Sequence, residues 1–600
     1  MILPPSLSRT RTSLAALAVG LSLATAPLSA TRANDPATTT PIKHVVVIFQ
    51  ENISFDHYFA TYPNATNPAG EPSFTPKPHT PEVNGIATAY AAPNNENSGQ
   101  PFRLDRTQAS TCDENHSYTP EQQAYHAGQN DLFVQLLGVT AGNAQQYCPT
   151  KATVMGYFDG NTVTAMWNYA QHFALNDNSY DTMYGPSSPG AVNLVSGNTF
   201  AIKPGTLNTT ATVHSINQTT GAGETSSVTI DGSDASGNTA SGSLIGDARP
   251  FGDDCNPSGS AEVAFNSPSV PKNIGDLLTA KGLSWGWFQG GFRPTTPYKA
   301  SASPPQSAVC GAMHEAADGT VKLDYIAHHE SFLYFPSTQN LHHVPPASTA
   351  EIGHAGQANH NYDLMDLFDI TSTSSPTSQT YNVNGLKKGV TLPAVTYIKA
   401  PGFMDGHPQY SNPLLEQHFI TQVINVLMAS QYWDDGLAIV ILYDDSDGWY
   451  DHVVPPLVNP SNNPAADGLT ATGQCGTPAS GAVLGRCGYG PRQPLMVIST
   501  YAKCNAVDHT LTDQTSTLRF IEDNWNLGRL DNPAKPVSAG GSFDQLAGSM
   551  LGMFDFHRNR HPLFLDTNGG VIFPFEDDCP GTSEHLGFGG GPFDHGPGRF

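Results

Sequence analysis

Two pairs of neighbouring polar residues have side chains that could bind a divalent cation. Glu51-Asn52 and Asp444-Asp445 each come directly after a strongly apolar segment. Carboxylate and amide oxygens are the hard ligands that such cations prefer. Adjacent carboxylates at the end of a buried strand are costly, because like charges repel and desolvation raises their pKa. A bound cation removes that cost, so these four residues are predicted to form one metal site.

Each pair also has a simpler interpretation. Glu51-Asn52 could begin a helix, with Asn52 as its N-cap and Asp56 in the first turn, and both interpretations of this pair remain open. The acidic pair could form a solvated turn, which the Asp-Gly sequence that follows it also favours. The buried segment that precedes Asp444 favours the metal interpretation there.

A candidate nucleophile lies in the segment YGPSSPGA, residues 184–191. Pro189 is suited to the first position of a helix, with Ser188 as the cap. The Ser187 hydroxyl would then lie at a helix N-terminus, where backbone N–H groups and the helix dipole favour an anion such as phosphate. A plain serine-rich turn is the alternative, and spacing alone favours it.

Five of the 22 histidines are candidate active-site residues because of their sequence neighbours. Each of them alone is more often a surface or structural residue, and coincidence accounts for many histidines in this chain. The five are His116, His328, His329, His407 and His509.

The apolar segments around these motifs predict the fold. Residues 42–49 form a continuous β-branched run typical of a buried strand in a parallel sheet, and residues 437–443 and 495–499 are similar. Residues 415–428 place apolar side chains on one helix face, and a further helix is predicted at 515–525. Alternating helices and strands indicate an α/β fold whose parallel sheet is covered on both sides. Sites in such sheets usually lie at the carboxyl ends of the strands.

We predict one large catalytic domain, residues 34–576, followed by a tail. The 600 residues include 57 glycines and 48 prolines, which indicates many turns and long loops. Residues 206–246 are rich in Thr, Ser, Gly and Asn and are predicted to be a low-complexity insertion, either hairpin-rich or mobile. Residues 577–600 are predicted to be an irregular Gly/Pro-rich tail.

Residues 1–33 have the pattern of a signal peptide. Arg9 and Arg11 precede an apolar run at residues 13–26, and small residues follow it. The run is shorter than the roughly 20 residues that a membrane-spanning helix needs, and no later segment is apolar enough to cross a bilayer. The mature protein is therefore expected to be secreted or periplasmic, without stable membrane insertion.

The eight cysteines agree with export, because an even number in an exported protein favours disulfides. None has the paired C-x-x-C spacing of a zinc site. Proximity in the sequence suggests the pairs Cys112–Cys148, Cys255–Cys310, Cys475–Cys487 and Cys504–Cys579.

The net charge is −25, and no Lys/Arg run stands out. Such a surface repels nucleic acid and anionic membranes at long range, so neither is expected as an obligate partner. Phosphate could still bind where local cations or backbone N–H groups gather at one site.

Together, these motifs resemble those of the bacterial phospholipases C and acid phosphatases, a branch of the alkaline-phosphatase-like superfamily. The matching segments occur in the same order between residues 42 and 525. They are VVVIFQENISFDHYFATYP, YGPSSPGAVNLVSG, YDDSDGWYDHVVPP, GPRQPLMVIST and STLRFIEDNW, with HHESFLYF around His328 and DGHP around His407. The resemblance implies a three-layer α/β sandwich with a mostly parallel central sheet and with insertions that form a cap.

The resemblance also implies roles for the marked residues. Glu51 and Asn52 match the first metal- and phosphate-binding pair, and Asp444 and Asp445 match the acidic pair that completes a site for one divalent metal ion. Ser187 matches the nucleophile, which is Thr in the phospholipases and Ser in the acid phosphatases. The residues expected to be catalytic are Ser187, His116 and His407, and those expected to bind substrate are Asn52, His328 and His329, with either member of the His328-His329 pair pointing inward.

Two departures from the family pattern favour the phosphatase branch. Ile53 stands where many members have Arg, and Pro189-Gly190-Ala191 follows the nucleophile where phospholipases often have Pro-Asn-Arg. The expected activity is therefore metal-dependent hydrolysis of a small phosphate monoester by an exported enzyme, through a phosphoserine intermediate.

The expected mechanism uses histidine in two ways. His116 or His407 would protonate the leaving alcohol, and protonated histidines would hold the phosphate dianion, which predicts an acidic optimum. Two alternatives remain. One is a phospholipase C that cleaves the phosphodiester of phosphatidylcholine-type lipids, and the other is an exported binding protein without turnover.

Overall fold

The computed structural model describes residues 36–572 apart from short internal gaps. The predicted signal peptide, the predicted tail and much of the insertion 206–246 therefore lie outside the described residues. The gaps are residues 87–96, 142–143, 203–209, 217–222, 230–241, 258–261, 266–271, 374–379, 464–465, 470, 472, 479–482 and 531–535.

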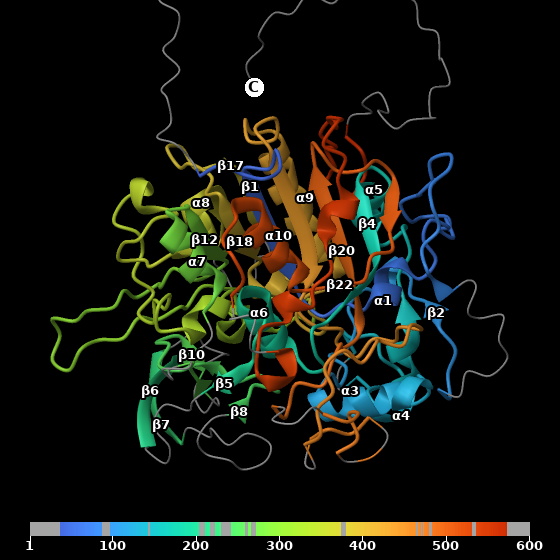
Figure 1. Ribbon diagram of the computed structural model, residues 1–600, viewed down its shortest axis with the longest axis horizontal. Helices are drawn as coiled ribbons and strands as arrows, with labels where there is room; N and C mark the ends of the chain where they lie inside the picture. The colour runs from blue at the N-terminus through green and yellow to red at the C-terminus, as the bar shows by residue number, and fades with distance from the viewer. Residues whose placement is uncertain are drawn as a thin grey trace, which may run out of the picture. The chain divides into compact units, whose positions relative to one another are not determined.

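A nine-stranded sheet runs through the centre of the described structure (Figure 1). Its strand order is β15-β12-β18-β1-β19-β20-β4-β21, and β22 also pairs with β4. The strands are β1 (His44–Gln50), β4 (Ala174–Tyr180), β12 (Trp285–Gln289), β15 (Asn361–Asp363), β18 (Val395–Lys399), β19 (Leu437–Tyr443), β20 (Arg492–Ser499), β21 (Ala506–Asp508) and β22 (Thr512–Asp513).

Both faces of this sheet are covered. Successive side chains of a strand point to opposite faces, and every residue of β1, β12, β18, β19 and β20 is buried. The described helices include α5 (Thr164–Ala170), α6 (Ser187–Ser196), α7 (Ile274–Lys281), α9 (Pro413–Met428) and α10 (Ser516–Trp525). The protein thus has the predicted fold, an α/β sandwich around a mostly parallel sheet.

The strand β20 runs against the direction of its neighbours. The strands from β15 to β19 are parallel to one another, whereas β20 is antiparallel to both β19 and β4. The predicted strand 495–499 therefore exists, but it does not extend the parallel part of the sheet. The connection between β19 and β20 contains no helix in its described residues, and parallel neighbours usually need a helical crossover.

Two helices begin at places that differ from the sequence interpretation. The helix α6 begins at Ser187 with Pro186 as its N-cap, so the prediction of Ser188 as the cap was wrong. Asp247 Oδ1 instead accepts hydrogen bonds from the N–H of Ser188 at 3.0 Å and from its hydroxyl at 3.1 Å. This carboxylate comes from a distant loop, which no local pattern identifies.

The helix α1 (Phe55–Phe59) follows the first polar pair. Its N-cap is Ser54, whose hydroxyl accepts the N–H of His57 at 3.2 Å. Asn52 is therefore not a helix cap, so the prediction that it begins the helix is wrong. Asp56 does lie in the first turn of the helix, as that prediction had it.

The remaining elements are short and lie outside the main sheet. The helices are α3 (Tyr118–Tyr125), α4 (Phe133–Leu136) and α8 (Leu364–Leu367). The strands are β2 (Phe102–Arg103), β3 (Gly156–Tyr157), β5 (Phe200–Ile202), β6 (Thr210–Ile216), β7 (Gly223–Thr229), β8 (Gly242–Ser243), β9 (Arg249–Pro250), β10 (Asn256–Pro257), β11 (Glu262–Val263), β13 (Met313–Glu315), β14 (Val321–Leu323), β16 (Phe368–Ser372) and β17 (Tyr381–Leu386). Of these, β6 and β7 pair as an antiparallel hairpin within the insertion. None of the described helices has the length and apolar character that crossing a membrane requires.

Three of the four suggested disulfides are present. They are Cys112–Cys148, Cys255–Cys310 and Cys475–Cys487, with Cα–Cα distances of 5.9, 5.6 and 6.0 Å. These separations fall within the usual range for a disulfide. The fourth suggested pair includes Cys579, which lies outside the described residues.

Candidate active site

Strands β1 and β19 bring the two predicted metal-binding pairs together. The strands are parallel neighbours whose carboxyl ends pair Gln50 with Tyr443. The next residues, Glu51 and Asp444, therefore leave the sheet side by side. The N–H of Asn52 donates a hydrogen bond to Asp444 Oδ1 at 2.9 Å, which joins the two pairs directly.

His329 joins this acidic cluster. The ligand atoms of Glu51, His329 and Asp444 all lie within 4.8 Å of one another, and all three residues are buried. His329 Nδ1 is 3.1 Å from Glu51 Oε1. His329 is therefore placed as a potential metal ligand, and its predicted role in substrate binding stays a prediction.

The donor set fits a divalent cation. The side-chain oxygens Asn52 Oδ1 and Asp444 Oδ2 are buried and have no hydrogen-bond partner among the described residues. Burial raises the pKa of Glu51, and the charge of Asp444 raises it further. Burial likewise raises the pKa of Asp445. A cation between these oxygens would relieve both the desolvation and the repulsion.

Asn52 has a backbone conformation that suits its position. Its φ of 61° lies in the left-handed region, which Asn tolerates better than most residues. Its side-chain amide donates to Asp447 Oδ1 at 3.2 Å. That bond leaves the amide oxygen as the free ligand atom.

Lys399, which the sequence analysis missed, supplies positive charge to the cluster. It ends β18 and is fully buried, with Nζ in contact with Glu51 Oε1 and 3.8 Å from Asp444 Oδ2. Burial lowers the pKa of Lys399, but the charges of Glu51 and Asp444 raise it by more. The available signal was the run Val-Thr-Tyr-Ile, typical of a strand, that precedes this lysine.

The hydroxyl of Ser187 faces the acidic cluster. Its Oγ lies 3.0 Å from Asp445 Oδ2 and 3.3 Å from Glu51 Oε2. Gly190 permits this approach, because a Cβ at that position would clash with the carbonyl oxygen of Asp444. As the first residue of α6, Ser187 also lies where backbone N–H groups favour an anion.

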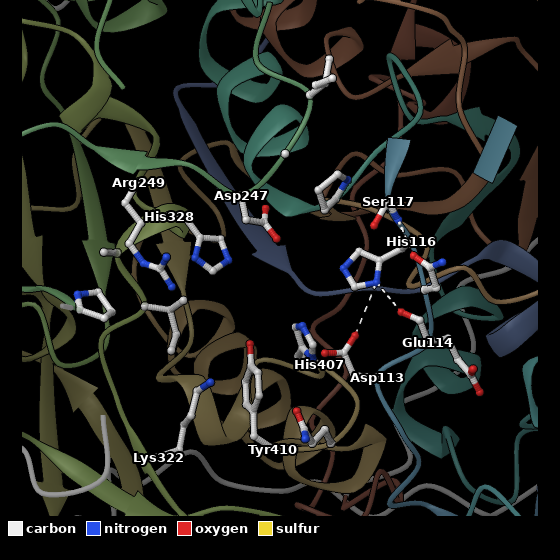
Figure 2. Close-up of a pocket in the computed structure, with 18 residues that line it drawn as sticks. Asp113, Glu114, His116, Ser117, Asp247, Arg249, Lys322, His328, His407 and Tyr410 are labelled. Carbon is white, nitrogen blue, oxygen red and sulfur yellow. Dashed lines mark hydrogen bonds and ion pairs between the residues drawn. The ribbon is translucent and has the colours of Figure 1, made fainter. Parts of the chain in front are cut away.

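A cavity of about 510 Å³ opens near the start of α6, and Figure 2 shows side chains that line it. Its wall includes Pro186, the residue that precedes the serine, together with three of the predicted histidines. Its other charged and polar lining residues come from several loops and from the short strands β9 and β14. They are Asp113, Glu114, Asn115, Ser117, Asp247, Arg249, Lys322, Gln409 and Tyr410.

His116 and His407 lie on this wall with their rings near each other. Their ring centroids are 6.2 Å apart. His116 Nδ1 lies 2.8 Å from the carbonyl oxygen of Glu114 and 3.3 Å from Asp447 Oδ1. Burial lowers the pKa of His116, but the charges of Asp445 and Asp447 raise it well above the usual value. His407 differs, because burial lowers its pKa to about 4.

The pair His328 and His329 is divided between the cavity and the acidic cluster. His328 lines the cavity, whereas His329 contacts Glu51. Burial lowers the pKa of His328 to about 3 and that of His329 well below its usual value. His509 is not brought to the site, because it is largely exposed and pairs with Asp177 Oδ1 at 2.7 Å.

The positive charge on the cavity wall therefore comes from fewer histidines than expected. His328 and His407 are neutral near pH 6, whereas Arg249 and Lys322 add charged groups on the same wall (Figure 2). The Lys322 ammonium lies 3.7 Å from the centre of the Tyr410 ring. No sequence motif marks Arg249, Lys322 and Tyr410, since they meet only when β9, β14 and the loop that carries Tyr410 come together.

In this α/β fold, a serine hydroxyl lies beside an acidic cluster at the carboxyl edge of a mostly parallel sheet. The chain belongs to the phosphoesterase family, whose model matches residues 42–528.

The curated relatives agree with that family. A non-hemolytic phospholipase C of Burkholderia pseudomallei is 23% identical over 88% of this chain and 64% of its own length. A hemolytic phospholipase C of Pseudomonas aeruginosa is 23% identical over 86% of this chain and 56% of its own length. A phospholipase C A of Mycobacterium tuberculosis is 22% identical over 87% of this chain and 78% of its own length. This chain thus spans less than two thirds of the first two proteins.

Proposed function

We propose that this protein is an exported, metal-dependent phosphodiesterase of the phospholipase C type, with Ser187 as its nucleophile. The observation that carries the proposal is the position of Ser187 Oγ, 3.0 Å from Asp445 and 3.3 Å from Glu51, at the start of a helix. A hydroxyl directed at buried carboxylates is suited to activation by a cation that those carboxylates share.

The metal site would be formed by Glu51, Asn52, Asp444 and Asp445. A cation held there would neutralise a phosphoryl oxygen and lower the pKa of the serine hydroxyl. Ser187, His116 and His407 are the groups proposed to act directly on the substrate.

The chain's own residues then carry the reaction in two steps. Ser187 Oγ passes its proton to Asp445 Oδ2, its hydrogen-bond acceptor, and attacks phosphorus, and the P–O bond to the leaving alcohol breaks. The proton returns to Ser187 Oγ when the phosphoserine is cleaved. His116, which holds a proton in its acidic surroundings, protonates the leaving oxygen. His407, neutral near pH 7, accepts a proton from the water that cleaves the phosphoserine.

The choice of a diester rests on the relatives, all three of which are named phospholipases C. The cavity of about 510 Å³ beside Ser187 also has room for a second ester group. A phosphodiester therefore replaces the phosphate monoester as the first candidate substrate. The sequence departures at Ile53 and Gly190 had favoured the monoester.

Hydrolysis of phosphate monoesters is the second candidate. The observation that favours it is the presence of three basic groups on the cavity wall, Arg249, Lys322 and a protonated His116, because a monoester dianion carries one more charge than a diester. The serine nucleophile, expected from the resemblance in the phosphatase branch, agrees with this candidate.

The disulfides are the observation that supports export of the protein. Three are present in the described residues, and disulfides persist mainly in oxidising compartments. The predicted signal peptide agrees with this location.

Rates on three substrates test the proposal. Purified mature protein is given phosphatidylcholine, bis(4-nitrophenyl) phosphate and 4-nitrophenyl phosphate across pH 4 to 9. Faster turnover of phosphatidylcholine and of the diester supports the phospholipase C reading, whereas faster turnover of the monoester moves the assignment to a phosphatase. A protein that binds metal but turns over none of the three is a binding protein, and the proposal is then wrong.

A further inference from the structure

A second group of catalytic residue types lies outside the acidic cluster. His314 Nδ1 is 2.6 Å from Asp324 Oδ1, and His314 Nε2 is 3.0 Å from Ser372 Oγ. None of these three residues was marked by a sequence motif. We propose that Ser372, His314 and Asp324 form a second hydrolytic site, which cleaves small carboxylic esters.

One hairpin holds both the acid and the base in place. The strands β13 and β14 pair His314 with Lys322, and Asp324 follows β14 directly. The N–H of Asp324 donates to the carbonyl of Ala312 at 3.0 Å, and its own carbonyl accepts the N–H of Gly402 at 2.8 Å. These bonds fix the carboxylate at the end of the hairpin.

The imidazole ring of His314 is fixed in orientation as well as in position. It stacks on Phe403, with ring centroids 4.4 Å apart and an interplanar angle of 18°. The ring is fully buried. Ser372 ends the strand β16 of the neighbouring hairpin and is part-buried.

The hydrogen-bond partners determine which nitrogen of the ring is the base. An ionised Asp324 only accepts hydrogen bonds, so Nδ1 carries the proton and donates it. The lone pair of Nε2 then accepts the hydroxyl proton of Ser372. This order of acid, imidazole and serine is the arrangement that activates a serine for attack on a carbonyl carbon.

Ser372 lines a cavity. A hydrogen-bond network with a purely structural role would not need such a cavity beside its serine. The cavity has a volume of about 260 Å³, and both Ser372 and Asp324 line it. Its apolar lining suits a short acyl chain or a small aromatic alcohol. The apolar lining residues are Pro294, Ala312, Met365, Ile370 and Tyr381.

Arg293 supplies a positive donor on the same wall. Its Nε is buried and has no hydrogen-bond partner among the described residues, although the residue lines the cavity. The guanidinium is anchored through Nη2 to Asp366, and the backbone N–H donates to Asp363 Oδ2 at 2.8 Å. A small shift of this side chain would turn the unpaired N–H toward the oxyanion that develops on an ester carbonyl.

The reaction needs no reagent other than water. Ser372 Oγ forms a bond to the acyl carbon while His314 takes the hydroxyl proton. The bond from the acyl carbon to the alcohol oxygen breaks, and His314 returns the proton to that oxygen. Water then repeats the exchange, which releases the carboxylic acid and restores Ser372.

The test must separate this site from Ser187, since both serines could react with acyl or phosphonyl reagents. All variants are therefore made in full-length mature protein that carries Ser187→Ala. The probes are 4-nitrophenyl acetate as substrate and a fluorophosphonate as a covalent label, with labelled peptides identified by mass spectrometry. The matched control is Thr371→Ala, the exposed neighbour on the same strand.

In the Ser187→Ala protein we expect ester hydrolysis and a label on Ser372. Adding Ser372→Ala should remove the label and lower kcat by at least about 100-fold, and Asp324→Asn should lower kcat while leaving KM nearly unchanged. The control should keep both properties. Circular dichroism and Tm of each variant show that it is folded.

Three results would overturn the proposal. One is loss of ester hydrolysis in Ser187→Ala itself, which would assign the activity to the first site. Another is equal hydrolysis with and without Ser372, with no label on that residue. The third is an equal loss in Thr371→Ala, which would mean that disturbance of the strand explains the effect.

Discussion

The N–H of Asn52 donates to Asp444 Oδ1 at 2.9 Å, across two strands whose residues are 392 positions apart in sequence. This bond fixes the spacing of the two pairs that are proposed to bind the metal. The parallel register of β1 and β19 sets the same spacing from the backbone. The site is thus positioned by the most buried part of the sheet, which favours a rigid arrangement.

Replacing the nucleophile should abolish turnover without loss of the fold. In Ser187→Ala, kcat for the preferred phosphate ester is expected to fall by at least about 10³-fold, because the attacking oxygen is removed. Ser196→Ala, at the other end of α6 with its hydroxyl bonded to the carbonyl of Val192, is the matched control and should keep its kcat. Steady-state kinetics with metal content measured in parallel gives the answer, and activity retained in Ser187→Ala would assign the nucleophile elsewhere.

Removal of the metal should lower both activity and stability. Without a cation, the buried carboxylates of Glu51, Asp444 and Asp445 repel one another. A ligand present at 100 times its dissociation constant stabilises a folded protein by about 2.7 kcal/mol, so Tm should fall on dialysis against a chelator and recover with added divalent cation. In Asp444→Ala, added divalent cation should not restore the Tm. A Tm that is indifferent to both treatments would argue against the metal site.

Lys399 should matter most when the cation is absent. Its ammonium is the buried positive charge in contact with Glu51, and removing one partner of a buried ion pair typically costs about 3–5 kcal/mol. Lys399→Met is therefore expected to destabilise the metal-free protein strongly and the metal-loaded protein less. Urea unfolding with and without cation measures the difference, with Lys399→Arg as the charge-conserving control. Equal destabilisation in both states would mean that the lysine and the cation do not compensate the same charge.

A pH-dependent contribution to stability is expected from His452. Its Nδ1 lies 2.7 Å from Asp56 Oδ2. Burial lowers the pKa of His452, but the charge of Asp56 and the hydrogen bond to it produce a net rise. A histidine whose pKa is higher in the folded state stabilises the protein below the unfolded pKa, near 6.5, and that stabilisation is lost as the pH rises through the folded value.

The variant His452→Asn measures this contribution. The free energy of unfolding should be lower than in the wild type by about 1.5–3 kcal/mol at pH 5.5, the range for a hydrogen bond to a charged group. The difference should shrink towards pH 9. The exposed His509, which also pairs with an aspartate, provides the control His509→Asn, with an expected effect of at most about 1 kcal/mol. A difference for His452→Asn that grew with pH would reverse the assigned sign.

Local sequence patterns were sufficient for the strands that carry the acidic pairs. The apolar runs 42–49 and 437–443 correspond to β1 (His44–Gln50) and β19 (Leu437–Tyr443). Such strands are buried on both faces, so they are continuously apolar, and polar residues at their ends stand out. The side-by-side position of Glu51 and Asp444 then follows from parallel pairing.

The rest of the site depends on contacts between distant segments. Lys399 reaches Glu51 because β18 lies beside β1 in the sheet, and strand order cannot be read from a strand's own residues. Asp247 replaces the predicted cap of α6 from 59 residues away. The triad of Ser372 likewise joins two hairpins. Each of these contacts is set by tertiary packing, for which the sequence has no periodic signal.

The close approach at Gly190 constrains how such an enzyme can change. The resemblance in the sequence motifs implies Asn at this position in the phospholipases, but here any β-carbon would collide with the backbone of Asp444. A single substitution toward that pattern would push the nucleophile's helix away from the sheet edge. Laboratory evolution that introduces a side chain at this position would therefore first need a compensating change in the turn after β19. The order of the mutations, and not their number alone, would decide which variants remain active.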